Sequence, residues 1–358
     1  MVEKLLTIVP RYGLANRMRA LASGLILGEA LQYKSCFYWE ENELCNCSFT
    51  KLFDSDLTEV GRPLMETTED QIFFSKEEMM GGIIEIGDEE KDKCLIVESF
   101  NPVMLEGTDR EDFQRLFSNK LKEVFSPSPE VKSKFVDLPE NCTGVHVRRT
   151  DNVSSRREST DEAFFVSMDK VLEEDSETKF YLATDSPEVK ESMILKYGNS
   201  KIITREIDSR RSRDTGIIDA LVDIFMLSKT NKILGSYGSS FSAISGSLGG
   251  ISQFPVIDQE ARNRRDGEKK EIDRILEIAL SQLERSEFDR AIENLLIIKN
   301  SFPYFFTVNL HLGKAYEGKG MYEEARECLE KYMSDYPFKE VPMGILERIN
   351  IGLGIGQN

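Results

Sequence analysis

Short apolar runs typical of β-strands alternate with longer amphipathic stretches typical of helices from residue 5 to residue 257. The first run covers 5–9, the amphipathic stretch after it covers 14–31, and a second run covers 35–39, which together form a βαβ pattern. Strands that alternate with helices favour parallel, doubly wound sheets, whose ligands bind at the carboxyl ends of the strands. The alternation therefore predicts an α/β fold.

The alternation continues along the chain. Further strands are expected at 83–86, 94–98, 144–148, 179–184, 202–204, 232–235 and 254–257, and helices at 112–124, 161–174, 187–197 and 215–228. The segment Ser126-Pro127-Ser128-Pro129 separates two such series and is expected to be a hinge. The sequence thus predicts two Rossmann-like domains, over 1–137 and 138–260.

After residues 262–266 the pattern becomes continuously helical and an internal repeat appears. Ala291 and Ala325 lie 34 positions apart, as do Pro303 and Pro337. This period, with small residues at close helix contacts and proline after the second helix, is typical of tetratricopeptide repeats. We expect two repeats over 268–340 and a tail or capping helix over 341–358; an unrelated pair of helical hairpins is the alternative.

The composition excludes several classes of protein. At 358 residues, 40% hydrophobic and 30% charged, the chain is expected to fold into several domains. Its formal charge of −17 argues against a nucleic-acid partner, although a local basic pocket for a small phosphorylated ligand stays open. The apolar run before Pro10 is too short for a signal peptide or a membrane span, so we expect a cytoplasmic protein.

Two patterns raise the question of a metal. Cys36, Cys45 and Cys47 are three of six scattered cysteines, which are expected to be thiols in a reducing compartment. A zinc site there lacks a second pair of ligands at the usual spacing. Asp54-Ser55-Asp56 matches the DxD of metal-dependent glycosyltransferases, but such pairs are frequent in an acidic sequence. We expect no metal site.

The segment 144–151, GVHVRRTD, carries the strongest chemical signal. Side chains alternate along a strand, so His146 and Arg148 share one face and the valines between them point into the core. Arg148 and Arg149 at the end of this strand suit a diphosphate, because a guanidinium pairs bidentately with phosphate oxygens. A solvated arginine pair beside a core histidine is the alternative.

Two other loops join a predicted strand to a predicted helix. In 235–242, GSYGSSFS, small residues let backbone N–H groups approach an anion at a helix amino terminus. In 11–17, RYGLANR, the spacing differs from the dinucleotide fingerprint, and we expect a phosphate or sugar contact or else a plain turn.

These segments together resemble the α1,6-fucosyltransferase group, which includes the core and nodulation enzymes, and more distantly the protein O-fucosyltransferases. The resemblance covers about residues 5–257 and is sharpest at GVHVRRTD, at YLATDSPEVK (181–190) and at VDIFMLS (222–228). It implies a GT-B-like pair of Rossmann-type domains, a GDP-fucose donor, inversion at the anomeric carbon and no metal or other cofactor.

The resemblance also implies roles for particular residues. Arg148 and Arg149 are similar to the family's diphosphate clamp, which neutralises the departing GDP. His146 is similar to the histidine beside the guanine. Asp223 resembles the carboxylate that reads the guanine edge, with Asp219 as the competing choice.

The two loops take donor-binding roles in the same resemblance. The family's serine-rich phosphate loop is matched by Ser239, Ser240 and Ser242. The amino-terminal glycine-containing loop that faces the donor is matched by Gly13 and Asn16.

The chain departs from those relatives just after the clamp. Asn152 and Arg156 stand where the relatives have Lys and, four positions later, a Glu implicated in acceptor activation. The base must then be another acid of the same loop, and we expect Glu158, on a flexible segment, ahead of Asp151. Asp161 is expected to cap the following helix.

We therefore expect transfer of a sugar, foremost L-fucose, from GDP to a hydroxyl of a glycan or glycoprotein that the helical repeats could hold. The alternatives are a transferase for another nucleotide sugar, and a non-catalytic nucleotide-sugar-binding scaffold that acts through its repeats.

Overall fold

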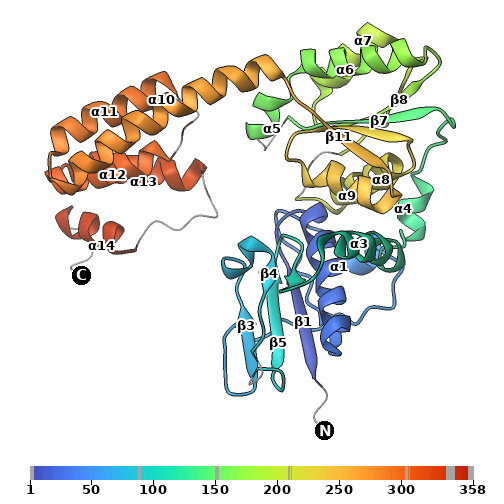
Figure 1. Cartoon of the computed structure of the whole chain (residues 1–358), viewed down its shortest axis with the longest axis horizontal. Coiled ribbons are helices and arrows are strands. Elements are labelled where there is room, and N and C mark those ends of the chain that lie inside the picture. The colour runs from blue at the N-terminus through green and yellow to red at the C-terminus, as the bar shows by residue number, and fades with distance from the viewer. Residues whose placement is uncertain are drawn as a thin grey trace. The chain divides into compact units, whose positions relative to one another are not determined.

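The computed structural model describes residues 4–87, 90–149, 153–208, 210, 212–302, 305, 307–335 and 343–353. The polypeptide divides after Asp258 into two compact units, an α/β unit and a helical unit (Figure 1). The α/β unit contains two large parallel sheets and a two-stranded one, and the described residues of the second unit form helices without strands. The expected α/β fold with parallel, Rossmann-like sheets, followed by an all-α module, is confirmed.

The amino-terminal sheet has the strand order β2-β1-β5-β3, and every pair in it is parallel. Its interior consists of residues such as Leu6, Ile8 and Leu95, which have no exposed surface. The elements of this half are β1 (Leu5–Pro10), α1 (Leu14–Leu31), β2 (Lys34–Phe37), α2 (Phe49–Leu52), β3 (Gln71–Phe74), η1 (Glu78–Gly81), β4 (Ile83–Ile84), β5 (Cys94–Ser99), β6 (Met104–Leu105), α3 (Arg110–Val124) and α4 (Pro129–Ser133).

The second sheet has the order β11-β10-β7-β8-β9 and is also parallel throughout. Helices α6 and α7 cover one face and α8 and α9 the other (Figure 1). Its elements are β7 (Cys142–Val147), α5 (Val153–Glu158), α6 (Asp161–Glu174), β8 (Lys179–Thr184), α7 (Pro187–Tyr197), β9 (Ile202–Ile203), α8 (Asp214–Ser228), β10 (Lys232–Ser236), α9 (Ser240–Gly249) and β11 (Ser252–Val256).

The two halves of the α/β unit share one continuous hydrophobic core, in which α1 and α3 contact α9. The expected hinge is wrong, because Ser128 caps α4 and is 5% exposed. Its hydroxyl accepts from the Val131 N–H at 3.3 Å and donates to the Lys51 carbonyl at 2.8 Å. A proline at the first helical position favours such a helix start, so the segment is packed structure. The predicted boundary at 137/138 stays a prediction.

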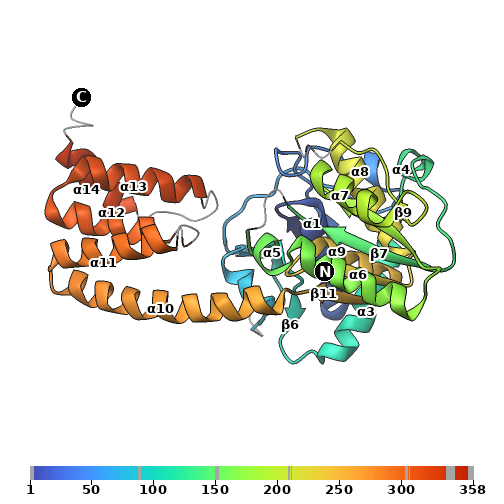
Figure 2. The same cartoon turned by 90° about the horizontal axis from the view of Figure 1, so that it is seen from above.

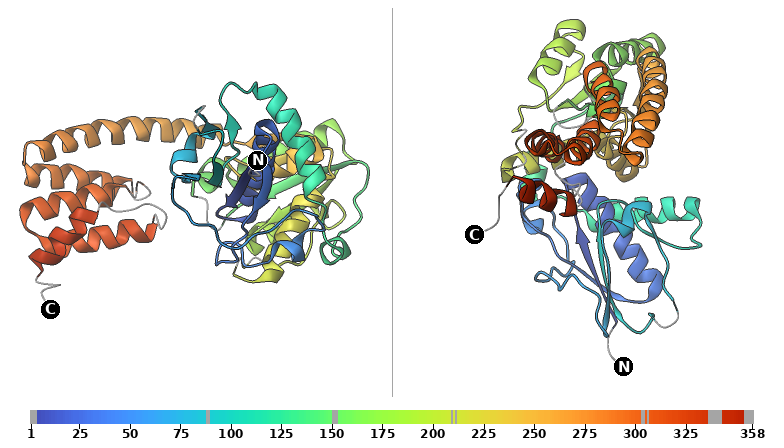
Figure 3. Two further views of the ribbon diagram at one scale, coloured as in Figure 1. Left: turned by 90° about the horizontal axis from the view of Figure 1, so that it is seen from below. Right: turned by 90° about the vertical axis from the view of Figure 1, so that its left-hand side faces the viewer.

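The helical unit consists of α10 (Gln259–Glu284), α11 (Phe288–Ser301), α12 (Val308–Lys319), α13 (Tyr322–Asp335) and α14 (Met343–Gly352). Figures 2 and 3 show these helices stacked side by side, with the first part of α10 extending beyond the stack. Ala291 and Ala325 are completely buried, as close helix contacts require. A Cβ at Gly313 would lie 2.7 Å from the Leu329 side chain, so this contact needs glycine. Pro303 and Pro337 lie outside the described residues.

Candidate functional site

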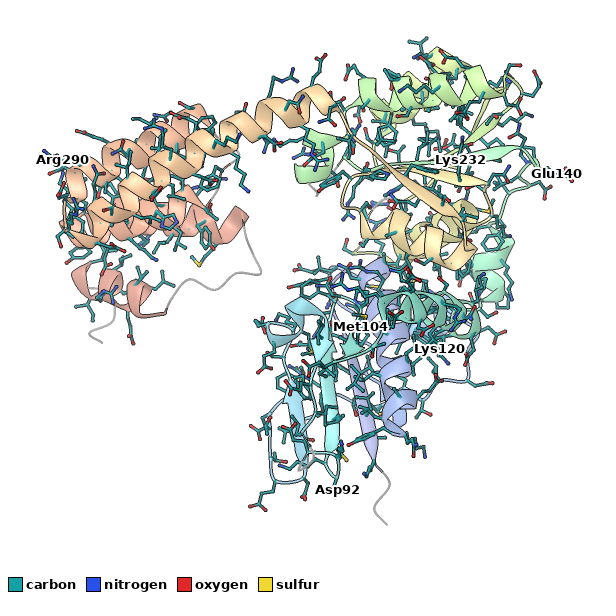
Figure 4. All side chains as sticks on the ribbon, in the orientation of Figure 1. Asp92, Met104, Lys120, Glu140, Lys232 and Arg290 are labelled. Carbon is teal, nitrogen blue, oxygen red and sulfur yellow. The ribbon has the colours of Figure 1, made fainter. Side chains whose placement is uncertain are left out.

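The carboxyl ends of three adjacent strands bring the predicted site residues of the second sheet together. Because β10, β7 and β8 are neighbours and parallel, the residues that follow them meet at one edge. Figure 4 labels Glu140 and Lys232, which lie at the opposite, amino end of these strands. Val145 and Val147 pack in the core beneath α6, as the alternation along β7 predicts.

Arg149 is fixed by acids of the protein itself. Its backbone N–H donates to Asp185 Oδ1 at 2.7 Å, and its Nε donates to Asp161 Oδ1 at 3.1 Å. Its guanidinium carbon lies 5.8 Å from the centroid of the Phe164 ring. Asp161 therefore orients this arginine and does not cap α6, since Thr160 is the cap residue. The prediction for Asp161 is wrong because Thr160 offers its hydroxyl one position earlier.

Arg148 and His146 connect β7 to the loop after β10. The backbone N–H of Arg148 donates to Ser236 Oγ at 3.0 Å, and that hydroxyl also lies 3.3 Å from the His146 carbonyl oxygen. The His146 ring stacks on Phe241 of α9, with centroids 4.6 Å apart and planes 16° apart. A hydrogen bond thus joins the arginine-bearing segment that follows β7 to the end of β10, where the serine-rich loop begins.

The serine-rich loop forms a tight turn into the amino end of α9. The Ser239 N–H donates to the Ser236 carbonyl at 3.2 Å, and Gly238 has a φ of 65°. Ser239 is 5% exposed, and among the described residues its hydroxyl has no hydrogen-bond partner. Ser242 is fully buried and donates to the Ser239 carbonyl at 3.3 Å, so it supports the turn from inside. Ser240 is the first residue of α9 and is partly exposed.

Asp219 is saturated by structural partners. Its Oδ1 lies 2.9 Å from both Lys134 Nζ and a guanidinium nitrogen of Arg205, and its Oδ2 accepts from the Asp208 N–H at 2.9 Å. It is 5% exposed. These contacts indicate that Asp219 anchors Arg205 and the segment before α8, and they leave it little capacity for a ligand.

Asp223 is also buried, but its two oxygens differ. Its Oδ1 accepts from the Tyr181 hydroxyl at 2.5 Å and from Arg205 at 2.9 Å, whereas no described residue donates to its Oδ2. Burial raises the pKa of Asp223 to about 6, although Tyr181 and Arg205 lower it. Asp223 lines a pocket of about 110 Å³ at the carboxyl ends of β8 and β9, together with Thr184, Asp185, Lys190, Arg205 and Glu206. This pocket adjoins Arg149 through Asp185.

Glu158 is not on a flexible segment, and that expectation is wrong. It is the last residue of α5, is 6% exposed, and its carbonyl accepts from the Asp258 N–H at 2.7 Å. The sequence analysis missed α5 because six residues are too few to show a helical period. Asp151 lies outside the described residues.

Gly13 and Asn16 lie at the start of α1, at the carboxyl edge of the amino-terminal sheet. Gly13 is the cap residue, and Asn16 Oδ1 accepts from Arg19 at 3.0 Å. The sequence analysis gave Arg17 no separate role, yet it is fully buried: it donates to the Tyr12 carbonyl at 2.7 Å and lies 5.0 Å from the Trp39 ring centroid. Among the described residues, no hydrogen bond joins Gly13 or Asn16 to the site on the second sheet.

Among the described residues, no three His, Cys, Asp or Glu side chains gather as metal ligands would. The six cysteines, all described, are free thiols. No helix in the described ranges combines the length and apolar character of a membrane crossing.

Residues 308–338 match the tetratricopeptide repeat family, which confirms the repeat over that range. No curated protein matches the chain in sequence. Among solved structures, it is similar to NodZ α-1,6-fucosyltransferase soaked with GDP-fucose, at 15% identity and a TM-score of 0.47 over 69% of this chain and 92% of that one. It is also similar to Arabidopsis thaliana FUT1 in complex with GDP, at 15% identity and a TM-score of 0.46 over 70% of this chain and 69% of that one. The similarity to POFUT1 in complex with GDP has 10% identity and a TM-score of 0.43 over 72% of this chain and 99% of that one.

Proposed function

We propose that this chain is an inverting, metal-independent glycosyltransferase that moves a sugar, foremost L-fucose, from a GDP-sugar to a hydroxyl of a glycan or glycoprotein. The observation that carries the proposal is the edge of the second sheet. There the arginine pair after β7, the turn before α9 and the Asp223 pocket after β8 gather within one set of connected contacts.

In this proposal, Arg148 and Arg149 neutralise the diphosphate as the sugar departs, so that two guanidinium groups supply the charge that a cation supplies elsewhere. The amino end of α9, with Ser239 and Ser240, donates to the same phosphates. Ser242 supports this turn from behind. Arg149 would share its guanidinium between Asp161 and phosphate, which keeps its position fixed before the donor arrives.

Asp223 recognises the guanine of the donor in this proposal. Its Oδ2 is the acceptor that the pocket offers to the N–H groups of guanine, while Tyr181 and Arg205 hold Oδ1. Asp219 acts indirectly, by fixing Arg205. His146, whose ring stacks on Phe241, lies between the clamp and α9 and stays our candidate for a contact near the guanine. Gly13 and Asn16, at the edge of the other sheet, stay our candidates for a further contact with the donor.

An inverting transfer needs a base within hydrogen-bond reach of the acceptor hydroxyl. The burial of Glu158 keeps a macromolecular acceptor away from its carboxylate. We therefore place Asp151 first and Glu158 second as the base. The helical repeats are proposed to hold the acceptor or a partner protein. Because free thiols suit a reducing compartment, we place this reaction in the cytoplasm.

Thermal unfolding with nucleotides tests the proposal directly. GDP at 100 times its Kd should stabilise the α/β unit by roughly 2.7 kcal/mol, without added metal and in the presence of EDTA. UDP should stabilise less, because uracil leaves the Asp223 carboxylate poorly paired. Release of GDP from GDP-fucose in the presence of an acceptor then separates an enzyme from a scaffold. Equal stabilisation by both nucleotides, or loss of the GDP effect in EDTA, would contradict the proposal.

A further inference from the structure

Two buried serines of the α5 region hold the turn between β10 and α9 from behind. The Ser155 hydroxyl donates to the Tyr237 carbonyl oxygen at 2.7 Å, and the Tyr237 N–H donates to Ser159 Oγ at 2.8 Å. Neither serine has any exposed surface. The Ser159 N–H donates to the Ser155 carbonyl at 2.9 Å, so the two hydroxyls are one helical turn apart and face the same residue.

Tyr237 occupies the position that decides how this turn is built. The turn runs from Ser236 to Ser239, and Gly238, its third residue, has a φ of 65° while the φ of Tyr237 is not positive. That combination defines a type II turn, which differs from type I by rotation of the peptide between the second and third residues. The carbonyl that Ser155 holds belongs to that peptide, so this hydroxyl stabilises the type II orientation.

The orientation of this peptide determines where the Gly238 N–H points. In a trans peptide the C=O and N–H bonds point in opposite directions, so the Gly238 N–H points away from Ser155. Among the described residues it has no protein acceptor. The neighbouring Ser239 hydroxyl is likewise without a partner there and is buried, which marks the same place as one that a ligand oxygen would complete.

Ser159 is itself held in place on the other side. Its hydroxyl donates to the Val256 carbonyl at 2.5 Å, so that its lone pair is directed to the Tyr237 N–H. Ser236, at the start of the turn, accepts from the Arg148 N–H. Buried serine hydroxyls therefore connect the turn both to β11 and to the arginine-bearing segment after β7.

We propose that Ser155 and Ser159 are positioning residues that preset this turn for a diphosphate group. They hold the C=O and the N–H of Tyr237 so that the Gly238 N–H and the amino end of α9 face the same anion as Arg148. The ligand class is a pyrophosphate-containing molecule, and the inference rests on the proposed function for its identification as a GDP-sugar. Neither serine touches the ligand.

The experiment compares full-length Ser155→Ala and Ser159→Ala with the wild type by calorimetric titration of GDP, guanosine and inorganic pyrophosphate. Loss of one well-aligned N–H bond to an anion should weaken GDP and pyrophosphate about tenfold. Guanosine affinity should not change, because the base pocket lies after β8. The double variant should lose little more than either single variant, because both hydroxyls hold the same residue, Tyr237, one through its C=O and the other through its N–H.

Ser23→Ala is the matched control. Ser23 is also fully buried, and its hydroxyl accepts from the Val103 N–H at 2.9 Å in the amino-terminal half. All three single variants should lose similar stability, but Ser23→Ala should keep wild-type affinity for pyrophosphate. Ser155→Thr keeps the hydroxyl, so if it folds, its GDP affinity should be close to that of the wild type. If Ser155→Thr does not fold, the GDP and pyrophosphate affinities of Ser159→Ala decide whether the positioning role holds.

The outcomes separate this inference from the proposed function. If GDP binds the wild type and the serine variants equally well, the positioning role is overturned and the proposed function stands. If pyrophosphate binds and the variants weaken it, but GDP has no advantage over UDP, the inference stands and the proposed function falls. If neither GDP nor pyrophosphate binds the wild type, both are overturned. An equal loss of guanosine and GDP affinity would also overturn the positioning role.

Discussion

Replacing Tyr181 by Phe should destabilise the α/β unit through the buried Asp223 carboxylate. The Tyr181 side chain is completely buried, and its hydroxyl lies 2.5 Å from Asp223 Oδ1. The substitution removes a single oxygen atom and keeps the ring. A hydrogen bond to a buried charged group contributes about 1.5–3 kcal/mol, and this is the loss that we expect at neutral pH.

The loss should depend on pH in a definite direction. Burial already raises the folded-state pKa of Asp223 to about 6, above its unfolded value of about 3.9. A raised folded-state pKa means that the stability contributed by this group is full below about pH 4 and is lost as the pH rises through about 6. Removing the Tyr181 donor raises the pKa further, so the variant should lose more than the wild type across this window. The difference between the two proteins should therefore grow with pH.

Tyr197→Phe is the matched control for this test. Its hydroxyl lies 2.8 Å from Asp169 Oδ1, but the Asp169 side chain is 45% exposed, so water replaces the lost bond. We expect a loss below about 1 kcal/mol there. Urea unfolding followed by the fluorescence of Trp39, the single tryptophan of the chain and 4% exposed in the core of the α/β unit, measures both variants. Equal losses in the two variants, or a Tyr181→Phe loss that shrinks as pH rises, would refute the reasoning.

Three further predictions concern the proposed function. Arg148→Ala and Arg149→Ala should each weaken GDP binding about tenfold or more in calorimetric titration, because a buried diphosphate loses a charged partner; folded variants with wild-type affinity would refute the clamp. Truncation after Arg264 should leave GDP affinity unchanged while it reduces transfer to a macromolecular acceptor, and a folded truncated chain that no longer binds GDP would contradict this. Asp151→Asn should lower kcat roughly 10²-fold at unchanged GDP affinity, and the same assay on Glu158→Gln decides which acid is the base, whereas near-normal turnover in both eliminates this loop.

The sequence by itself determined the elements whose signal is local. The helix over residues 14–31 and the strand over 179–184 have the predicted bounds, because the length of an apolar run and the residue types in it are local features that need no distant partner. The 34-residue repeat is likewise visible without a structure, since each repeat contacts mainly its neighbours. The position of the arginine pair at the end of a strand was also predictable, because residues that follow a strand of a parallel sheet lie at its carboxyl edge, where such sheets usually bind ligands.

Tertiary structure alone decided which of those residues are available to a ligand. The sequence favoured Asp223 and left Asp219 as the competing choice. Only the position of Arg205 and Lys134 shows that Asp219 is saturated while Asp223 keeps an oxygen without a described donor. The sequence around Ser155 does not indicate that its hydroxyl donates to the Tyr237 carbonyl, because the two residues lie 82 positions apart in the chain. Such pairings depend on how strands and helices pack after folding, and a local pattern carries no information about partners that packing brings from elsewhere in the chain.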